Sequence, residues 1–200
     1  MSSSGSRAAT IRLVGGRPAI DLVNTISWRR APEPRQQDHL LTVDDALRWC
    51  VRAGVLSEAE STALAAGPGV GNVLLPALRA VRDAIGRHLV DVPTPELPEL
   101  EPLIVDALTH SRLVDLGDRV SWRVADLDES TPARRIVLDL YAYLSDPRGR
   151  LGVCADEECR WAFVDTSKRG DRIWCSSADC GNRHRARRHH ALRRTKQDAP

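Results

Sequence analysis

Four of the five cysteines lie in the last quarter of the chain and form two pairs with equal spacing. The pairs are Cys154-x4-Cys159 and Cys175-x4-Cys180, and a loop of 15 residues separates them. Four thiolates fill the tetrahedral coordination sphere of zinc, which leaves no open position for a catalytic water. The spacing therefore predicts one structural zinc ion bound by these four cysteines.

Other interpretations of the four cysteines stay open on the sequence alone. The alternatives are an iron–sulfur cluster, redox thiols and no metal, because each pair is two residues longer than the commonest zinc knuckle. Three histidines follow the cysteines: His184, His189 and His190. They are possible alternative metal ligands, but we expect them at the surface because four cysteines are available. We expect a small aromatic core over the metal, formed by Trp161, Phe163 and Trp174.

The segment that follows Cys180 is rich in arginine and histidine, and its pattern predicts a helix. Between Cys180 and Gln197 there are seven Lys and Arg and no Asp or Glu. Guanidinium groups bind phosphate in a bidentate way, so such a helix suits DNA, with RNA left open. One basic stripe at helical spacing is formed by Arg183, Arg187, His190 and Arg194. The predicted nucleic-acid-binding residues are Arg183, Arg185, Arg187, Arg188, His190 and Arg194.

The distribution of charge supports this interpretation. Residues 1–150 carry 18 Lys and Arg against 20 Asp and Glu, whereas residues 151–200 carry 11 against 7. The positive excess therefore lies in the part that holds the cysteine pairs. The alternative is a basic helix that docks on the acidic first part of the same chain.

Hydrophobic periodicity predicts that helices build most of the part before the cysteines. Helices are expected at 18–26, 42–52, 57–66, 73–90, 95–110 and 132–144. Thr42 and Ser57 are the expected N-caps of the second and third helices. A short strand is expected at 11–14, a hairpin at 114–124, and a boundary turn at 146–149.

Composition limits the class of protein. With 42% hydrophobic and 28% charged residues the chain can bury a core and is typical of a soluble protein. No apolar run reaches the ~20 residues of a membrane helix, and residues 1–10 lack a signal peptide. We therefore expect a cytoplasmic protein with no membrane partner. The odd number of cysteines argues against a disulfide framework, and Cys50 is expected to be a buried, inert thiol.

Two motifs in the chain match known patterns. The first runs Cys154-x4-Cys159-x-Trp161-x-Phe163-x-Asp165-x-Ser167, then Arg172-x-Trp174-Cys175-Ser176 and Cys180-Gly181-Asn182-Arg183, and it resembles the CGNR zinc-finger family. The second, Gly15-Gly16-x-Pro18-Ala19-x-Asp21-x-Val23-Asn24-Thr25, resembles the ABATE domain that forms the N-terminal part of this family. Together the two resemblances cover nearly the whole chain. They imply a bacterial stress-induced transcription regulator, zinc on the four cysteines, and a helical N-terminal domain with a sensing role.

Three polar residues stand out within the apolar sequence near the N-terminus: Asp21, Asn24 and Thr25. One interpretation places them in an effector pocket. The other has them cap a helix or bond to the Gly15-Gly16 turn. No catalytic triad, phosphate-binding glycine loop or pair of catalytic carboxylates can be assembled. We therefore predict no enzyme activity and no catalytic residues.

These observations predict a mainly α protein with minor β structure. The expected order is a flexible N-terminus (1–10), an ABATE-like multihelical domain (11–147), a CGNR-type four-cysteine zinc-finger module with a basic C-terminal helix (148–195), and a flexible tail (196–200). The predicted function is a DNA-binding transcriptional regulator whose structural zinc presents the arginine-rich helix to nucleic acid. The alternative is a zinc-stapled ligand-binding or protein-interaction protein without nucleic-acid contact. The sequence also leaves open a small-molecule effector and a homodimer.

Overall fold

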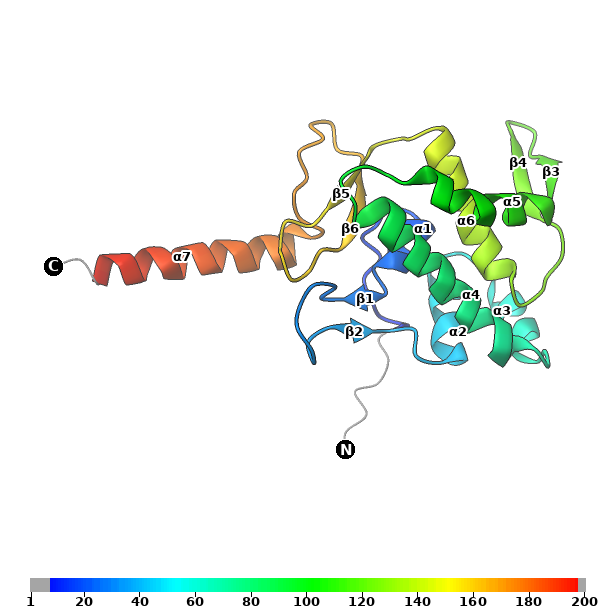
Figure 1. Ribbon diagram of the computed structural model, residues 1–200, viewed down its shortest axis with the longest axis horizontal. Helices are drawn as coiled ribbons and strands as arrows, with labels where there is room; N and C mark the ends of the chain where they lie inside the picture. Colours follow the sequence, from blue (N-terminus) through cyan, green and yellow to red (C-terminus); the bar gives the residue numbers. More distant parts are fainter. Residues whose placement is uncertain (1–7, 198–200) are drawn as a thin grey trace.

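The computed structural model describes residues 8–197, and within the last helix it describes the side chains of residues 182–190 and 193. Helices dominate a rounded body, and the last helix projects from this body as an arm (Figure 1). In chain order the helices are α1 (Pro18–Val23), α2 (Val43–Arg52), α3 (Glu58–Ala65), α4 (Val70–Ile85), α5 (Glu101–Thr109), α6 (Thr131–Ser145) and α7 (Asn182–Gln197). The mainly α class, ending in a four-cysteine cluster and a basic helix, is confirmed.

The strands form three separate antiparallel pairs. The pairs are β1 (Ile26–Ser27) with β2 (Gln37–Asp38), β3 (Ser111–Asp115) with β4 (Val120–Val124), and β5 (Arg150–Val153) with β6 (Ala162–Asp165). The β3–β4 pair is the hairpin expected around Gly117, whose positive φ of 87° favours glycine at the turn. No helix in the described part of the chain is long and apolar enough to cross a bilayer.

The core forms around the short helix α1. Its residues from Ala19 to Val23 are buried, and the helix packs against α4, α6 and strand β6. Helix α4 presents a buried stripe at helical spacing: Leu74, Leu78, Val81 and Ile85. Because β6 contributes Ala162 and Val164 to this same core, the cysteine-containing part is attached to the helical body by apolar packing.

Local hydrogen bonds fix where two of the helices begin. Thr42 and Asp45 form a reciprocal capping box at the start of α2, and Ser57 and Glu60 form another at α3. In each box the hydroxyl and the carboxylate accept backbone N–H groups that the helix itself leaves unpaired. Both caps therefore agree with the expectation from the sequence.

Three expected elements differ from the structure. Residues 11–14 form no strand. The backbone bond that joins the N-terminal segment to β6 comes one residue later, where the Val164 N–H donates to the Gly15 carbonyl. Helix α1 ends at Val23, where the Thr25 hydroxyl donates to the Leu22 carbonyl and turns the chain into β1. The expected helix at 73–90 begins at Val70 and changes at Ile85 into a π-helical turn, Gly86–Val90.

Candidate metal centre and nucleic-acid interface

The four paired cysteines meet at one point between β5, β6 and the start of α7. Their sulfur atoms lie within 4.8 Å of one another, and all four residues are buried. The Sγ atoms are 3.7 Å apart for Cys159 and Cys175, and 3.3 Å apart for Cys175 and Cys180. Zinc with Zn–S bonds of ~2.3 Å places its sulfurs about 3.8 Å apart, so the cluster fits one structural zinc ion. The ion would join two segments of the chain and leave no ligand position open.

Backbone bonds also connect the segments that carry the two cysteine pairs. The Cys154 N–H donates to the Trp161 carbonyl, and the Ala155 N–H donates to the Ile173 carbonyl. The first bond closes the loop of the first pair, and the second links this pair to the segment just before the second pair. These bonds help to hold the four cysteines in the arrangement of the cluster.

Aromatic side chains cover the cysteine cluster. Phe163 is fully buried against the four cysteines, and Trp161 and Trp174 pack beside it, as expected. Trp28 also packs there, which the sequence did not indicate because Trp28 lies more than a hundred residues earlier. Its φ of 55° lies in the left-handed region, which is rare for a tryptophan, and this turn directs the ring toward the cluster.

A buried carboxylate, Asp156, supports the knuckle and the helix that follows it. Its Oδ1 accepts the Cys159 N–H at 3.2 Å, and its side chain is 1% exposed. Its Oδ2 lies 3.3 Å from the Arg183 guanidinium and 3.7 Å from that of Arg187. Because a buried carboxylate needs such partners, Asp156 fixes the first two turns of α7 relative to the metal centre.

Arg183 occupies the base of α7 and contacts the metal centre directly. Its Nη2 donates to the Cys180 sulfur at 2.8 Å, and its guanidinium lies 4.5 Å from the Trp28 ring centroid. Burial acts to lower the pKa of Arg183, but the negative charges of Cys180 and Asp156 outweigh it and raise that pKa. Arg183, which the sequence suggested for nucleic-acid contact, is therefore engaged in structural contacts at the base of the arm.

The start of α7 is held by side-chain bonds from the residues around it. Ser176 Oγ accepts the Asp179 N–H, and the Asp179 carboxylate pairs with Arg12. The Asn182 side chain donates to the Ala178 carbonyl, and Arg185 donates to the Ser177 carbonyl. These bonds surround the Cys180-Gly181-Asn182-Arg183 motif and set the direction in which the arm leaves the body.

Beyond this base the predicted nucleic-acid residues face solvent. Residues 184–190 of the arm are exposed, which includes Arg185, Arg187, Arg188 and His190. The side chain of Arg194 lies outside the described residues. The arm projects away from the helical body (Figure 1), and within the described residues the helical body does not cover the side chains of 184–190.

The three residues suggested for an effector pocket are buried at the joint between body and zinc module. Asp21 Oδ1 accepts the Gly15 N–H at 2.7 Å, which is the bond to the glycine turn considered above. The Asn24 carboxamide donates to the Ala162 carbonyl and accepts the Ala162 N–H, both at 2.8 Å. The Thr25 hydroxyl donates to Leu22. Their polar atoms are engaged with backbone groups, which agrees with the structural interpretation of this motif.

Cys50 is buried in α2, and burial raises the pKa of its thiol to about 12. At neutral pH it is therefore protonated and unreactive, in agreement with the expectation of an inert thiol.

Two protein-family models match parts of the chain. A family model described as "CGNR zinc finger" matches residues 150–193. A second, named ABATE and described as "Putative stress-induced transcription regulator", matches residues 16–147, which is more than half of the chain. A search of curated proteins gave no match.

Proposed function

The chain belongs to the ABATE family and carries a CGNR zinc finger, and we propose that it is a transcriptional regulator whose zinc module presents α7 to DNA. The helical body carries the regulatory input. The zinc ion is structural, and the contact with DNA is made by the arm.

The observation that carries this proposal is the exposed, cationic arm. Residues 184–190 include three arginines and three histidines, and all of these side chains are exposed. A helix with this residue pattern has no apolar face to bury, so packing against the rest of the protein does not explain its sequence. DNA phosphates supply the negative charge that the arm lacks, and an α-helix fits the major groove.

The structure supports a division of labour among the arginines. Arg183 is held by Asp156, Cys180 and Trp28, so in this proposal it sets the angle of the arm. Arg187 is 57% exposed and has only long contacts of 3.7 Å with Asp156 and Glu158, so it can turn toward a phosphate. Arg188 is exposed and has no recorded partner among the described residues, which makes it the strongest candidate for a phosphate contact.

A salt titration tests the proposal. We expect the affinity of the purified protein for duplex DNA to fall with salt concentration, with a log–log slope of about −0.9 for each phosphate contact. The Arg187→Gln/Arg188→Gln double variant should bind more weakly and reduce the slope by about 2. Arg119→Gln, an exposed arginine on the hairpin turn, is the matched control and should leave the slope unchanged. Absence of binding at low salt would argue against the proposal.

A protein-interaction role is the second candidate, and it is favoured by the outer face of the hairpin. Leu113 and Trp122 are cross-strand partners and are 59% and 40% exposed, and Val120 on the same face is 58% exposed. An exposed apolar face of this kind is typical of a contact surface. Sedimentation analysis of the wild type and of Leu113→Ser tests whether this face joins two copies of the chain.

A further inference from the structure

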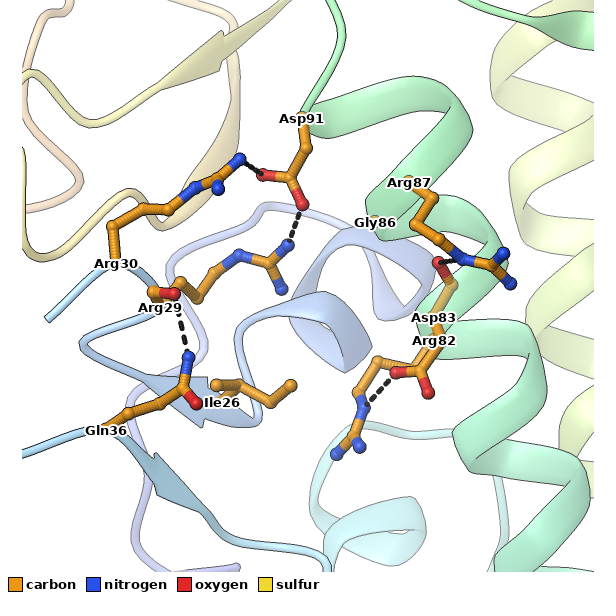
Figure 2. Close-up of a pocket in the computed structure, with 9 residues that line it drawn as sticks. All are labelled: Ile26, Arg29, Arg30, Gln36, Arg82, Asp83, Gly86, Arg87 and Asp91. Atoms are coloured by element: carbon orange, nitrogen blue, oxygen red, sulfur yellow. Dashed lines mark hydrogen bonds and ion pairs between the residues drawn. The ribbon is translucent and has the colours of Figure 1, made fainter. Parts of the chain in front are cut away.

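A cavity of about 470 Å³ lies in the helical body, between α4 with its π-helical turn and the loop that joins β1 to β2. Four arginines and two aspartates line it: Arg29, Arg30, Arg82, Arg87, Asp83 and Asp91 (Figure 2). Its volume lies in the range of small-molecule sites. No residue that the sequence suggested for an effector pocket is among those that line this cavity.

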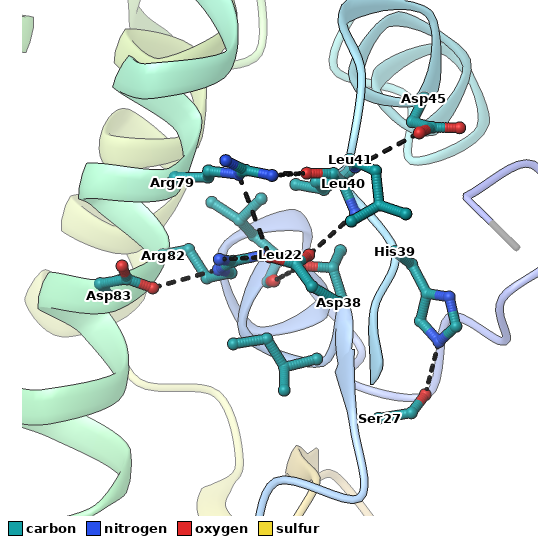
Figure 3. A network of polar contacts seen from close by, with 12 residues as sticks. Leu22, Ser27, Asp38, His39, Leu40, Leu41, Asp45, Arg79, Arg82 and Asp83 are labelled. Carbon is teal, nitrogen blue, oxygen red and sulfur yellow. Dashed lines mark hydrogen bonds and ion pairs between the residues drawn. The ribbon is translucent and has the colours of Figure 1, made fainter. Parts of the chain in front are cut away.

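The charges in this cavity do not balance. Asp91 is shared by Arg29, at 2.6 Å, and by Arg30, at 3.8 Å. Arg82 is bonded to Asp83 and to Asp38, and Asp38 belongs to the polar network that fixes β2 (Figure 3). Arg87 donates only to the backbone carbonyl of Asp83, and the structure records no carboxylate partner for it within residues 8–197. The cavity therefore keeps a positive excess.

Arg29 also has a hydrogen-bond donor that no group among the described residues accepts. Its side chain is 9% exposed, and its Nε is buried without a hydrogen-bond partner among the described residues. A buried donor without a partner costs free energy, and here this donor belongs to a residue that lines the cavity. Gly86 of the π-helical turn lies against the same side chain, and a Cβ at this position would be 3.1 Å from Arg29 Nη2. The wall is thus shaped by a turn type that is frequent at functional sites.

The wall of this cavity is also hydrogen-bonded to the zinc knuckle. The Arg29 N–H donates to the Cys159 carbonyl, and the Arg30 N–H donates to the Glu158 carbonyl. Trp28, the preceding residue, lies beneath the guanidinium of Arg183 at the base of α7. A shift of this short segment would therefore act on a metal ligand and on the residue that sets the angle of the arm.

We infer that this cavity binds a small anionic molecule through a phosphate or carboxylate group, and that the bound anion acts on the zinc module through the segment from Trp28 to Arg30. Paired guanidinium groups bind either group in a bidentate way. Arg30 and Arg87 line the cavity with exposed side chains that can reach the anion, and Arg29 lines it with a mostly buried one. The binding step stands by itself, and the effect on DNA rests on the proposed function.

Calorimetry tests the binding step, with inorganic phosphate and pyrophosphate as one set of probes and succinate as the other. We expect one set to bind the wild type, and each of Arg30→Gln and Arg87→Gln to weaken that binding about tenfold. Both variants change exposed side chains, so the fold should persist, and circular dichroism checks this. Arg119→Gln is the matched control and should bind as the wild type does. Equal affinity in all four proteins, or no binding of any probe in the millimolar range, would overturn the inference.

Hydrogen exchange tests the coupling without DNA. The probe that binds should slow exchange in peptides that cover residues 26–36 and 154–163 of the wild type, and should have no such effect in Arg87→Gln. Binding that leaves residues 154–163 unchanged would overturn the coupling. Because neither measurement involves DNA, failure of the site and failure of the DNA proposal can be told apart.

Discussion

Asp21 is a buried carboxyl group that bonds to the Gly15-Gly16 turn, and its raised pKa makes the stability of the fold depend on pH. Burial is the main cause that raises its pKa, from 3.8 to about 6, and the bond from Gly15 opposes this only in part. Gly15 itself cannot be replaced easily, since a Cβ there would lie 2.8 Å from the Asp21 amide nitrogen. The geometry of this turn is therefore set by the close approach of two backbone segments.

The pH dependence of stability should reveal this group. Because the folded-state pKa lies above the unfolded value, the folded state holds the proton more tightly, so stability falls as pH rises from about 4 to about 6. We expect Asp21→Asn to remove this component, which amounts to about 3 kcal/mol across that range. Urea unfolding at several pH values measures the difference, with the exposed Asp118→Asn as control. Parallel pH profiles of the wild type and Asp21→Asn would contradict the assignment.

The sequence identified some of these residues better than others, for a physical reason. Metal ligands are revealed by residue type and short spacing, so the four cysteines could be predicted. Other contacts join residues that are far apart in the sequence: Asn24 bonds to Ala162, and Trp28 contacts Arg183. No local pattern connects such residues, so these contacts could not be predicted. The sequence suggested polar residues within an apolar helix as one possible effector pocket, whereas the arginines of the cavity in Figure 2 come from two separate segments that no local pattern connects.

At the scale of elements, helix α3 depends on polar contacts because only Leu64 of its residues is buried. Glu60 closes its capping box with Ser57 and also receives two bonds from Arg135 of α6, at 2.6 and 3.0 Å. The bond from Arg135 is the main cause that lowers the pKa of Glu60, from 4.5 to about 2. The Glu60 carboxylate therefore caps the first turn of α3 and also bonds this helix to α6.

Glu60→Gln should weaken this connection at neutral pH. The folded-state pKa lies below the unfolded value, so ionised Glu60 contributes stability above pH 4.5, and this contribution is lost as pH falls toward 2. Since the group is partly exposed, we expect a loss of about 1 kcal/mol at neutral pH, which shrinks in acid. Thermal unfolding checks this, and Glu58→Gln in the same helical turn should have a smaller effect. A constant difference at every pH would contradict the ionic origin.

Periodicity and capping residues predict most of the helices and turn residues predict the β3–β4 hairpin, whereas the β1–β2 and β5–β6 pairs have no such local signal. The two capping boxes and the buried stripe of α4 are local patterns, and the structure contains all of them. The strands β1 and β2 have only two residues each, which is too short for a sequence pattern. Strand β6 packs on α1, which is distant in the sequence. Residues 11–14 alternate as a strand does, but the structure gives them no strand partner within the described residues.

At the scale of the whole molecule, Asn24 joins the helical body to the zinc module. Its carboxamide pairs with both backbone groups of Ala162 on β6, as a neighbouring strand would. Asn24→Ala would leave the Ala162 N–H and C=O buried without partners, so we expect a loss of about 2–4 kcal/mol of stability. Urea unfolding measures this, with the exposed Asn72→Ala as control. A loss within ~0.5 kcal/mol of the control would show that the joint is held by packing alone.

Removal of one zinc ligand should act mainly on the module. Three thiolates leave the coordination of zinc incomplete, so Cys175→Ser should retain less zinc than the wild type when metal content is measured by mass spectrometry. The helical body has its own core, and its unfolding transition should persist. Full retention of zinc by this variant would refute coordination by all four cysteines.

In the proposed function the arm makes the contact with DNA, and the zinc centre only holds the arm in place. A chain shortened to residues 1–184 keeps the four cysteines, Arg183 and the helical body, but loses every cation further along the arm. Its affinity for duplex DNA, compared with that of the full chain at equal salt and equal zinc content, is the most direct measurement. We expect binding to weaken by more than about a hundredfold, because the phosphate contacts are gone. Equal affinity of the two chains would contradict the account and place the DNA contact, if any, on another surface.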